Sequence, residues 1–288
     1  MTEKIKQQIE SFINDRIISF SPVSGGCIND SNVITTQSGK SYFVKSNIDS
    51  AKDMFLKEAN GLNELSKSNA IRVPRVFYTS EDFLLIENIR YAKKDKLFWE
   101  NFGRNFANLH RRVNNNFGFY EDNYIGSTPQ LNIPELNEKE NWTEFYFNKR
   151  LLFQYKLAES NGYVNSEFRK CFTLLEKNIN LIFQNCNVKG SLLHGDLWSG
   201  NFICDEKGQA CLIDPAVYYG HREADLAMTK LFGGFDTRFY SAYNEELRLE
   251  EDFEYRENIY KLYHVLNHLN LFGSGYLRQA IDLIKYYL

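Results

Sequence analysis

The sequence predicts an α+β protein of two lobes: a small antiparallel sheet with one key helix, followed by a larger and mainly helical part. Strand-like runs are concentrated in the first 90 residues, where Ser38-Gly39 marks a tight turn between two of them. Helical periodicity dominates the remainder, over residues 97–111, 142–160, 168–183 and 253–272. No repeat or long linker interrupts the chain, so we divide it into lobes of residues 1–90 and 91–288.

The predicted elements follow one another in a simple order. After an N-terminal helix, the first lobe should contain strands at 17–20, 32–36 and 41–45, a helix at 51–66, and strands at 75–79 and 83–87. In the second lobe, residues 203–214 indicate a tight hairpin, and Gly273 separates the helix before it from a last helix at 275–287. Ligand sites favour the cleft between two such lobes, so we expect the chemistry there.

Composition narrows the class of protein. With 43% hydrophobic and 25% charged residues, the chain has the make-up of a globular protein. Its net charge of −3 argues against a nucleic-acid partner, because binding to a phosphate backbone needs a basic face. No apolar run approaches the about 18 residues of a membrane span, and charges stand where a signal peptide needs its apolar stretch. We therefore expect a soluble, cytoplasmic protein with neither a nucleic-acid nor a membrane partner.

An acidic residue stands within the apolar face of the helix predicted at 51–66. At about 100° per residue, one stripe of this helix collects Ala51, Met54, Phe55, Leu62 and Leu65. Glu58 lies in the middle of that stripe, and a buried carboxylate is costly unless a cation meets it. Lys45, on a strand thirteen residues earlier, offers the cation. The two residues form either a plain buried ion pair or a lysine held in place to touch phosphates.

Three polar residues further along the chain have a spacing that suits metal and phosphate chemistry. Asp196 and Asn201 are five residues apart, and Asp214 closes the next predicted hairpin. Asp196 suits the acceptance of a hydroxyl proton, while Asn201 and Asp214 offer hard oxygen ligands to Mg²⁺. Any one of them alone fits a solvated loop or an N-cap. Together, on loops at strand ends, they follow the order in which protein kinases carry H-R-D-x-x-x-x-N and D-F-G.

At these residues the chain resembles the kinase-like phosphotransferases, and within them the fructosamine (ketosamine) kinase family. The resemblance spans almost the whole chain and rests on His194-Gly195-Asp196-Leu197-Trp198-Ser199-Gly200-Asn201, on residues 220–235, and on Gly26-Cys27-Ile28-Asn29, Phe117-Gly118-Phe119, residues 122–126 and Asn141-Trp142. The stretch 220–235 is the most specific of these, because aminoglycoside and choline kinases share only H-G-D-x-x-x-x-N.

Departures from the protein-kinase pattern indicate a small-molecule kinase without phosphorylation control. His194-Gly195-Asp196 lacks the arginine that would receive an activation-loop phosphate, Asp214-Pro215-Ala216 replaces D-F-G, and no Ala-Pro-Glu follows.

The resemblance implies a protein-kinase-like fold, ATP and Mg²⁺ as cofactors, and phosphorylation of the 3-hydroxyl of a ketosamine, the glycation product of an amine. The 3-phosphate would then decompose and free the amine, which is deglycation. Asp196 would be the catalytic base, Lys45 fixed by Glu58 would orient the phosphates, and Asn201 and Asp214 would hold Mg²⁺. The nucleotide would also meet the loop at Gly25 and Gly26 and the interlobe hinge at Glu87, Asn88 and Ile89.

The acceptor side of the site is less sharply defined by sequence. Trp198 follows the base by two residues, so its ring is either a platform for a sugar or amine or a core side chain. His221 and Glu223 either line the acceptor pocket or brace it. The resemblance implies that Asp225 accepts backbone hydrogen bonds from the catalytic loop. We expect His110, His264 and His268 to be structural.

Cys27 stands apart from the other four cysteines because it adjoins Gly25-Gly26. The odd count, without C-x-x-C, favours neither a disulfide framework nor a zinc site. Backbone N–H groups that cradle phosphate favour a thiolate, so Cys27 is either a redox-sensitive thiol or a small loop residue. The resemblance favours the redox-sensitive thiol. We therefore expect a monomer that can form a redox-linked dimer through Cys27.

Two other functions remain as alternatives: a kinase for another amine or alcohol, such as an aminoglycoside or homoserine, and a nucleotide-binding pseudokinase. The five residues Lys45, Glu58, Asp196, Asn201 and Asp214 argue against the pseudokinase, since a non-catalytic relative has no need of them all.

Overall fold

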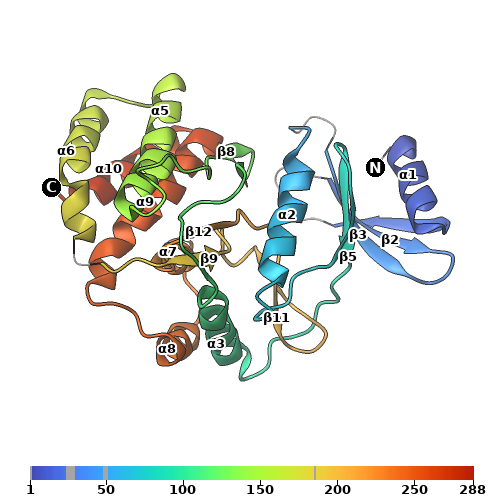
Figure 1. Ribbon diagram of the computed structural model, residues 1–288. Coiled ribbons are helices and arrows are strands. Elements are labelled where there is room, and N and C mark those ends of the chain that lie inside the picture. Colours follow the sequence, from blue (N-terminus) through green and yellow to red (C-terminus); the bar gives the residue numbers. More distant parts are fainter. Residues whose placement is uncertain (1, 24–29, 48–50, 185) are drawn as a thin grey trace.

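Two lobes lie side by side in the computed structural model, which describes residues 2–23, 30–47, 51–184 and 186–288 (Figure 1). The first lobe is built on a five-stranded antiparallel sheet, and the second is mainly helical. The predicted α+β fold class is therefore confirmed. The predicted Gly25, Gly26 and Cys27 of the phosphate loop lie outside the described residues.

Every neighbouring pair of strands in the first sheet is antiparallel. Across the sheet the order is β1 (Ile17–Pro22), β2 (Asp30–Thr36), β3 (Ser41–Ser46), β5 (Phe83–Glu87) and β4 (Val76–Thr79). The predicted Ser38-Gly39 turn joins β2 to β3, with Gly39 at a φ of 81° that suits glycine. All five predicted strands are present, within a few residues of their expected ends.

The sheet is covered by one helix on each face, α1 (Glu3–Ile13) and α2 (Met54–Ser66) (Figure 1). Side chains alternate between the faces of a strand, which explains this arrangement. Val44 belongs to a buried cluster with Ile9 of α1, whereas Leu84 belongs to a cluster with Phe55 of α2. Lys45 follows Val44 and so emerges on the α2 side, where the structure places the cleft.

The second lobe is formed by helices around one large hydrophobic core. In chain order these are α3 (Phe98–His110), α4 (Trp142–Tyr146), a π-helical segment (Phe147–Leu152), α5 (Phe153–Ser160), α6 (Ser166–Phe183), α7 (Glu223–Leu231), α8 (Thr237–Glu246), α9 (Phe253–Phe272), a 3₁₀ turn (Ser274–Tyr276) and α10 (Leu277–Lys285). The helix predicted at 142–160 is thus interrupted by a π-helical segment. This segment carries the fully buried Arg150, whose guanidinium lies 4.1 Å from the ring centre of Tyr218.

Short strands in the second lobe carry the loops of the cleft. They are β6 (Val113–Asn114), β9 (Gly190–Leu193) and β12 (Tyr218–Gly220) in one sheet, the β7 (Asn123–Ile125) and β8 (Thr128–Gln130) hairpin, and the predicted hairpin of β10 (Phe202–Cys204) and β11 (Ala210–Leu212). The segment 194–201 connects β9 to β10, and Asp214 follows β11 by two residues. The spacing of Asp196, Asn201 and Asp214 is therefore set by this strand–loop–hairpin unit.

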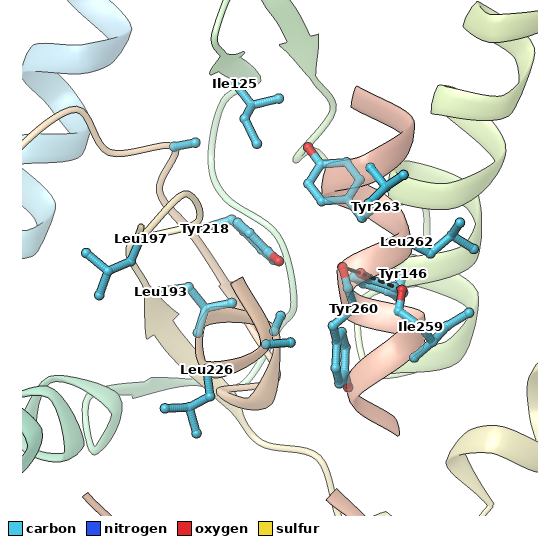
Figure 2. Packing of buried hydrophobic residues seen from close by; sticks show 14 of the residues in the cluster. Ile125, Tyr146, Leu193, Leu197, Tyr218, Leu226, Ile259, Tyr260, Leu262 and Tyr263 are labelled. Atoms are coloured by element: carbon cyan, nitrogen blue, oxygen red, sulfur yellow. Dashed lines mark hydrogen bonds between the residues drawn. The ribbon is translucent and has the colours of Figure 1, made fainter. Parts of the chain in front are cut away.

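Helix α9 is mostly buried and packs against α7. Figure 2 shows its Tyr260 and Tyr263 facing a layer that includes Leu193 and Tyr218. The hydroxyl of Tyr146 donates to backbone carbonyls at the start of this stretch of α9, at 3.3–3.4 Å. No helix within the described residues has the length and apolar character that crossing a bilayer requires.

Candidate active site

A buried cation lies at the centre of the cleft. Lys45 Nζ is 2.5 Å from Glu58 Oε1 and also contacts Asp214 Oδ1, so β3, α2 and the loop after β11 meet at this ammonium group. Burial lowers the pKa of Lys45, but the carboxylates of Asp214 and Glu58 outweigh burial and raise it. The two side chains predicted to pair therefore do so, and Lys45 remains charged.

An aspartate of α7 fixes the backbone of the segment that follows β9. The carboxylate of Asp225 accepts hydrogen bonds from the backbone N–H groups of His194 (2.7 Å) and Gly195 (2.8 Å). Gly195 has a φ of 84°, and a Cβ there would stand 1.9 Å from the carbonyl oxygen of Ala216. Glycine is therefore required at this turn, and the expected role of Asp225 in positioning the loop is present in the structure.

Above this support, Asp196 and Asn201 are joined within the loop. The Asn201 amide donates to the backbone carbonyl of Asp196 (2.7 Å) and to its Oδ2 (3.2 Å). The pKa of Asp196 is raised well above 3.8, first by burial and then by the negative charges of Asp214 and Asp225. A general base is most effective when its pKa approaches the working pH, so this environment suits proton acceptance.

The side-chain oxygen atoms of Asn201 and Asp214 suit a hard divalent cation. Asn201 uses its amide nitrogen on Asp196, so its carbonyl oxygen is the atom that remains for a metal. Asp214 has a φ of 55°, a conformation that non-glycine residues rarely adopt and that is enriched at functional sites. One carboxylate and one amide oxygen are hard donors, and such donors favour Mg²⁺ over softer ions.

Two cavities meet at this charged centre. One of about 400 Å³ lies toward the sheet and is lined by apolar side chains and by Glu87, Asn88 and Ile89. The other, of about 250 Å³, lies toward α9 and contains Asp196. Lys45, Glu58 and Asp214 line both.

The predicted hinge borders the larger cavity, but its first side chain is occupied elsewhere. The carboxylate of Glu87 accepts from Arg72 at 2.6 Å and from the backbone N–H of Arg75 at 3.2 Å. The Glu87 carboxylate is therefore already paired within the protein and is not free for a ligand in this cavity.

Trp198 lies at the smaller cavity and keeps 38% of its surface exposed. Its indole folds over Gly200, where an added Cβ would stand 2.5 Å from ring carbons. The ring of Phe232 lies edge-on, with centroids 6.5 Å apart. The structure thus places Trp198 on the cleft wall instead of in the core.

His221 and Glu223 correct an expectation, because neither lines the acceptor-side cavity. Glu223 is fully buried and accepts from the Arg256 guanidinium at 2.8 and 2.7 Å. His221 is 2% exposed, and its Nδ1 lies 2.5 Å from the hydroxyl of Tyr260. His221, just before α7, and Glu223, in its first turn, both contact side chains of α9. The structure therefore supports the bracing alternative and places neither side chain at the cavity that contains Asp196.

The cavity beside Asp196 is also lined by residues that sequence reasoning did not select: Asn123, Tyr124, Asn267, His268 and Phe272. Two signals were available. Residues 122–126 already carried the family resemblance, and Asn267-His268 is an adjacent polar pair between Leu266 and Leu269 of a predicted helix. His268, expected to be structural, is therefore a cleft residue as well.

The two-lobed fold is the one that kinase-like phosphotransferases have. Among solved structures, the aminoglycoside phosphotransferase APH(4)-Ia, in a ternary complex with AMP-PNP and hygromycin B, matches with a TM-score of 0.66 and 14% identity, covering 98% of each chain. At that identity the likeness concerns the fold alone.

The chain belongs to the fructosamine kinase family, whose model matches residues 1–288. It is 39% identical over 280 residues to a chloroplastic protein-ribulosamine 3-kinase of Arabidopsis thaliana, covering 95% of this chain and 83% of that one. A probable ketoamine kinase of Synechocystis is 36% identical, with coverage of 98% and 95%. A candidate fructosamine-3-kinase from Thermobifida fusca has a TM-score of 0.89 at 28% identity, covering 100% and 99%. The resemblance is confirmed: the protein is a phosphotransferase, and its fold and family imply the use of ATP.

Proposed function

We propose that this protein is an ATP- and Mg²⁺-dependent ketosamine 3-kinase, which transfers the γ-phosphoryl group to the 3-hydroxyl of a ketosamine sugar. The observation that carries the proposal is the pair of cavities that share Lys45, Glu58 and Asp214. Two ligands placed on either side of these residues would meet at the phosphate that is transferred. Asp196 belongs to the smaller cavity, where the acceptor hydroxyl would lie.

The charged residues have distinct tasks in this reaction. Lys45 exchanges its contact with Asp214 for the phosphates, while Glu58 keeps the ammonium in position. Asn201 and Asp214 would hold Mg²⁺, which when bound neutralises phosphate charge. Asp196 accepts the proton of the acceptor hydroxyl while the hydroxyl oxygen forms a bond to the γ-phosphorus. ADP leaves with the electron pair of the bond that joined it to this phosphorus. Positioning and charge neutralisation supply most of the catalysis.

Each lobe has its own ligand in this proposal. In this proposal residues 1–90 form the nucleotide-binding lobe, with the hinge at residues 87–89, and residues 91–288 form the catalytic and acceptor-binding lobe. The position of β5, which ends at Glu87 beside the larger cavity, supports this division. The names of the relatives support a ketosamine acceptor and hence a role in the deglycation of proteins or metabolites.

A panel of acceptors tests the proposal. ADP release is measured with ribulosamine, erythrulosamine and fructosamine, each as a free glycated amine and as glycated protein, and with an aminoglycoside and homoserine. We expect turnover with one or more ketosamines and none with the last two. Turnover confined to an aminoglycoside or homoserine would assign a different kinase, and nucleotide binding without transfer to any acceptor would indicate a pseudokinase.

A further inference from the structure

One of the five histidines has a buried ring nitrogen without a partner. Nδ1 of His264, on α9, is shielded from solvent and meets no hydrogen-bonding group among the described residues. Each of the other four has a ring nitrogen within hydrogen-bond distance of a described atom: His110 meets Tyr243 and Asp225, His194 the carbonyl of Ile213, His221 the hydroxyl of Tyr260, and His268 the carbonyl of His264.

An unpaired buried nitrogen destabilises a fold, so its persistence calls for an explanation. The charged group that faces it is the carboxylate of Asp196, with Oδ1 at 3.9 Å from His264 Nδ1. That distance is too long for a hydrogen bond in the free protein. Catalytic hydrogen bonds are often long in free enzymes and tighten only when the substrates are bound.

The other side of the same carboxylate is already fixed. Asn201 donates to Asp196 Oδ2 and to its backbone carbonyl, so Oδ1 is the oxygen that meets no donor within the described part of the chain. His264 itself lines neither cavity, although Asn267 and His268 on the same helix line the smaller one. An acceptor molecule therefore cannot reach His264 Nδ1, and Asp196 remains as the group that can.

The surroundings of His264 keep its ring neutral, with a single N–H. Burial first, then the nearby His268 and Arg150, lower the pKa of His264 to about 3, against an opposing influence of Asp225. The ring of Tyr263 also packs beside it, with centroids 5.0 Å apart. A neutral imidazole with its proton on Nδ1 is a donor with the right polarity for a carboxylate oxygen.

We propose that His264 is a positioning residue, whose Nδ1–H donates to Asp196 Oδ1 when nucleotide and acceptor fill the cleft. With Asn201 on Oδ2 and His264 on Oδ1, the carboxylate is held from both sides, and its remaining lone pair is aimed at the acceptor hydroxyl. This inference rests on the proposed function, because it assigns a partner to the base of that reaction.

Three substitutions at this position separate positioning from packing. His264→Asn places an amide N–H close to the location of Nδ1, His264→Gln places it near Nε2, and His264→Phe keeps a ring without a donor. We expect His264→Asn to retain most of the wild-type kcat. The Gln and Phe variants should lose roughly 10–100-fold in kcat, with the KM for ATP and for the ketosamine little changed, as for other residues that orient a catalytic group.

The melting temperature supplies the control, because His264→Phe removes an unpaired polar atom and should be as stable as wild type or more so. A second readout uses ¹⁵N-histidine-labelled protein: the Nδ1–H signal missing from His264→Phe should become protected from exchange when Mg²⁺, AMP-PNP and a ketosamine are added. Wild-type kcat in His264→Phe, or an Asn variant as impaired as Phe, would overturn the positioning role while leaving the proposed function standing. A wild-type protein inactive with every ketosamine would overturn the proposed function, and this inference with it.

Discussion

Two buried carboxylates, Asp225 beside the segment 194–201 and Asp196 within it, have pKa values that are shifted in opposite directions. Beneath it, Asp225 accepts two backbone N–H groups and lies 3.3 Å from His110 Nε2, and these contacts lower its pKa although burial alone would raise it. On the cleft side, Asp196 accepts from one side chain of the described residues, that of Asn201, and its pKa is raised by burial and by Asp214. Two aspartates from one small region thus have opposite electrostatic environments.

The difference separates scaffold from reaction site. A carboxylate whose partners are all within the protein fixes the backbone and has no capacity left for a ligand. A carboxylate that lacks partners carries an energetic cost which a bound proton, metal or substrate removes, and such perturbed groups cluster at functional sites. Substitutions of Asp196 and Asp225, and of the residues around them, test this difference.

Asp196→Asn should reduce turnover by roughly 10²–10⁴-fold, because the amide does not accept the hydroxyl proton. The fold and nucleotide binding should remain nearly intact, since the amide fills the same space. Steady-state kinetics, with circular dichroism and nucleotide titration as controls, measure both. Near-normal turnover in a folded variant would remove Asp196 from the role of base.

Asp214→Ala should abolish Mg²⁺-dependent nucleotide binding, because the carboxylate supplies the charge that holds the ion beside phosphate. Asn201→Ala is the matched milder variant, since it removes a neutral ligand. Calorimetric titration with AMP-PNP, with and without Mg²⁺, compares the two. Equal Mg²⁺ dependence in wild type and Asp214→Ala, or a crystal structure with the ion away from both side chains, would contradict these assignments.

Asp225→Ala should act on stability rather than on one substrate. It leaves two backbone N–H groups unpaired, at about 1–3 kcal/mol each, so we expect a loss of roughly 2–6 kcal/mol in the free energy of unfolding. Because the pKa of Asp225 is below 3.8 in the folded protein, this stabilisation is present above about pH 4 and is lost as the pH falls through the folded pKa. Thermal unfolding of both proteins should therefore differ most near neutrality and converge in acid. A constant difference down to pH 2 would argue against the hydrogen-bonded carboxylate as its source.

Trp198→Ala tests the wall of the acceptor cavity. If the indole is a platform for the sugar or amine, the KM for the ketosamine should rise several-fold more than the KM for ATP. Because Trp198 is 38% exposed, we expect little change in melting temperature. Equal effects on both substrates, or a large loss of stability, would return this residue to a packing role.

Cys27 carries the smallest predicted effect. We propose that the protein is a monomer whose activity falls reversibly on mild oxidation, through Cys27, and that a redox-linked dimer forms through the same thiol. Burial first, among other causes, raises the pKa of Cys186 and Cys211 to about 12, so these thiols should react slowly. Cys27→Ala should remain active and resist oxidant, and dithiothreitol should restore the wild type. Activity is assayed with and without oxidant, and gel filtration follows the dimer. Equal loss of activity in wild type and Cys27→Ala would place any switch elsewhere.

The sequence alone predicts the charged centre, because a charged residue in an apolar helical stripe is a visible exception to the hydrophobic periodicity. Glu58 is an acid within an apolar helical stripe, and such an acid needs a cation, which Lys45 provides on a strand thirteen residues earlier. The sequence spacing of Asp196, Asn201 and Asp214 also indicates the site, because the loops that follow β9 and β11 carry all three residues to the cleft. Local chemistry of this kind is encoded in neighbouring residues.

What sequence reasoning missed depends on contacts between distant segments. His221 and Glu223 lie close in sequence to Asp214, but His221 just before α7 and Glu223 in its first turn both contact α9, which periodicity does not reveal. The β7–β8 hairpin, which brings Asn123 to the cleft, has strands of three residues, too short to show alternation. Its position is set by long-range bonds such as that from the Asn123 amide to the carbonyl of Val217, at 2.8 Å.

The position of the transferred phosphate is the most direct test of the account. Wild-type protein and Asp196→Asn would be incubated with ATP, Mg²⁺ and a ¹³C-labelled ribulosamine, and the product followed by ³¹P and ¹³C NMR. The account predicts a phosphate on the 3-oxygen in the wild-type reaction, followed by release of the free amine, and a rate at least about 100-fold lower for Asp196→Asn. Phosphate on a different oxygen, or product formed by Asp196→Asn at the wild-type rate, would contradict it.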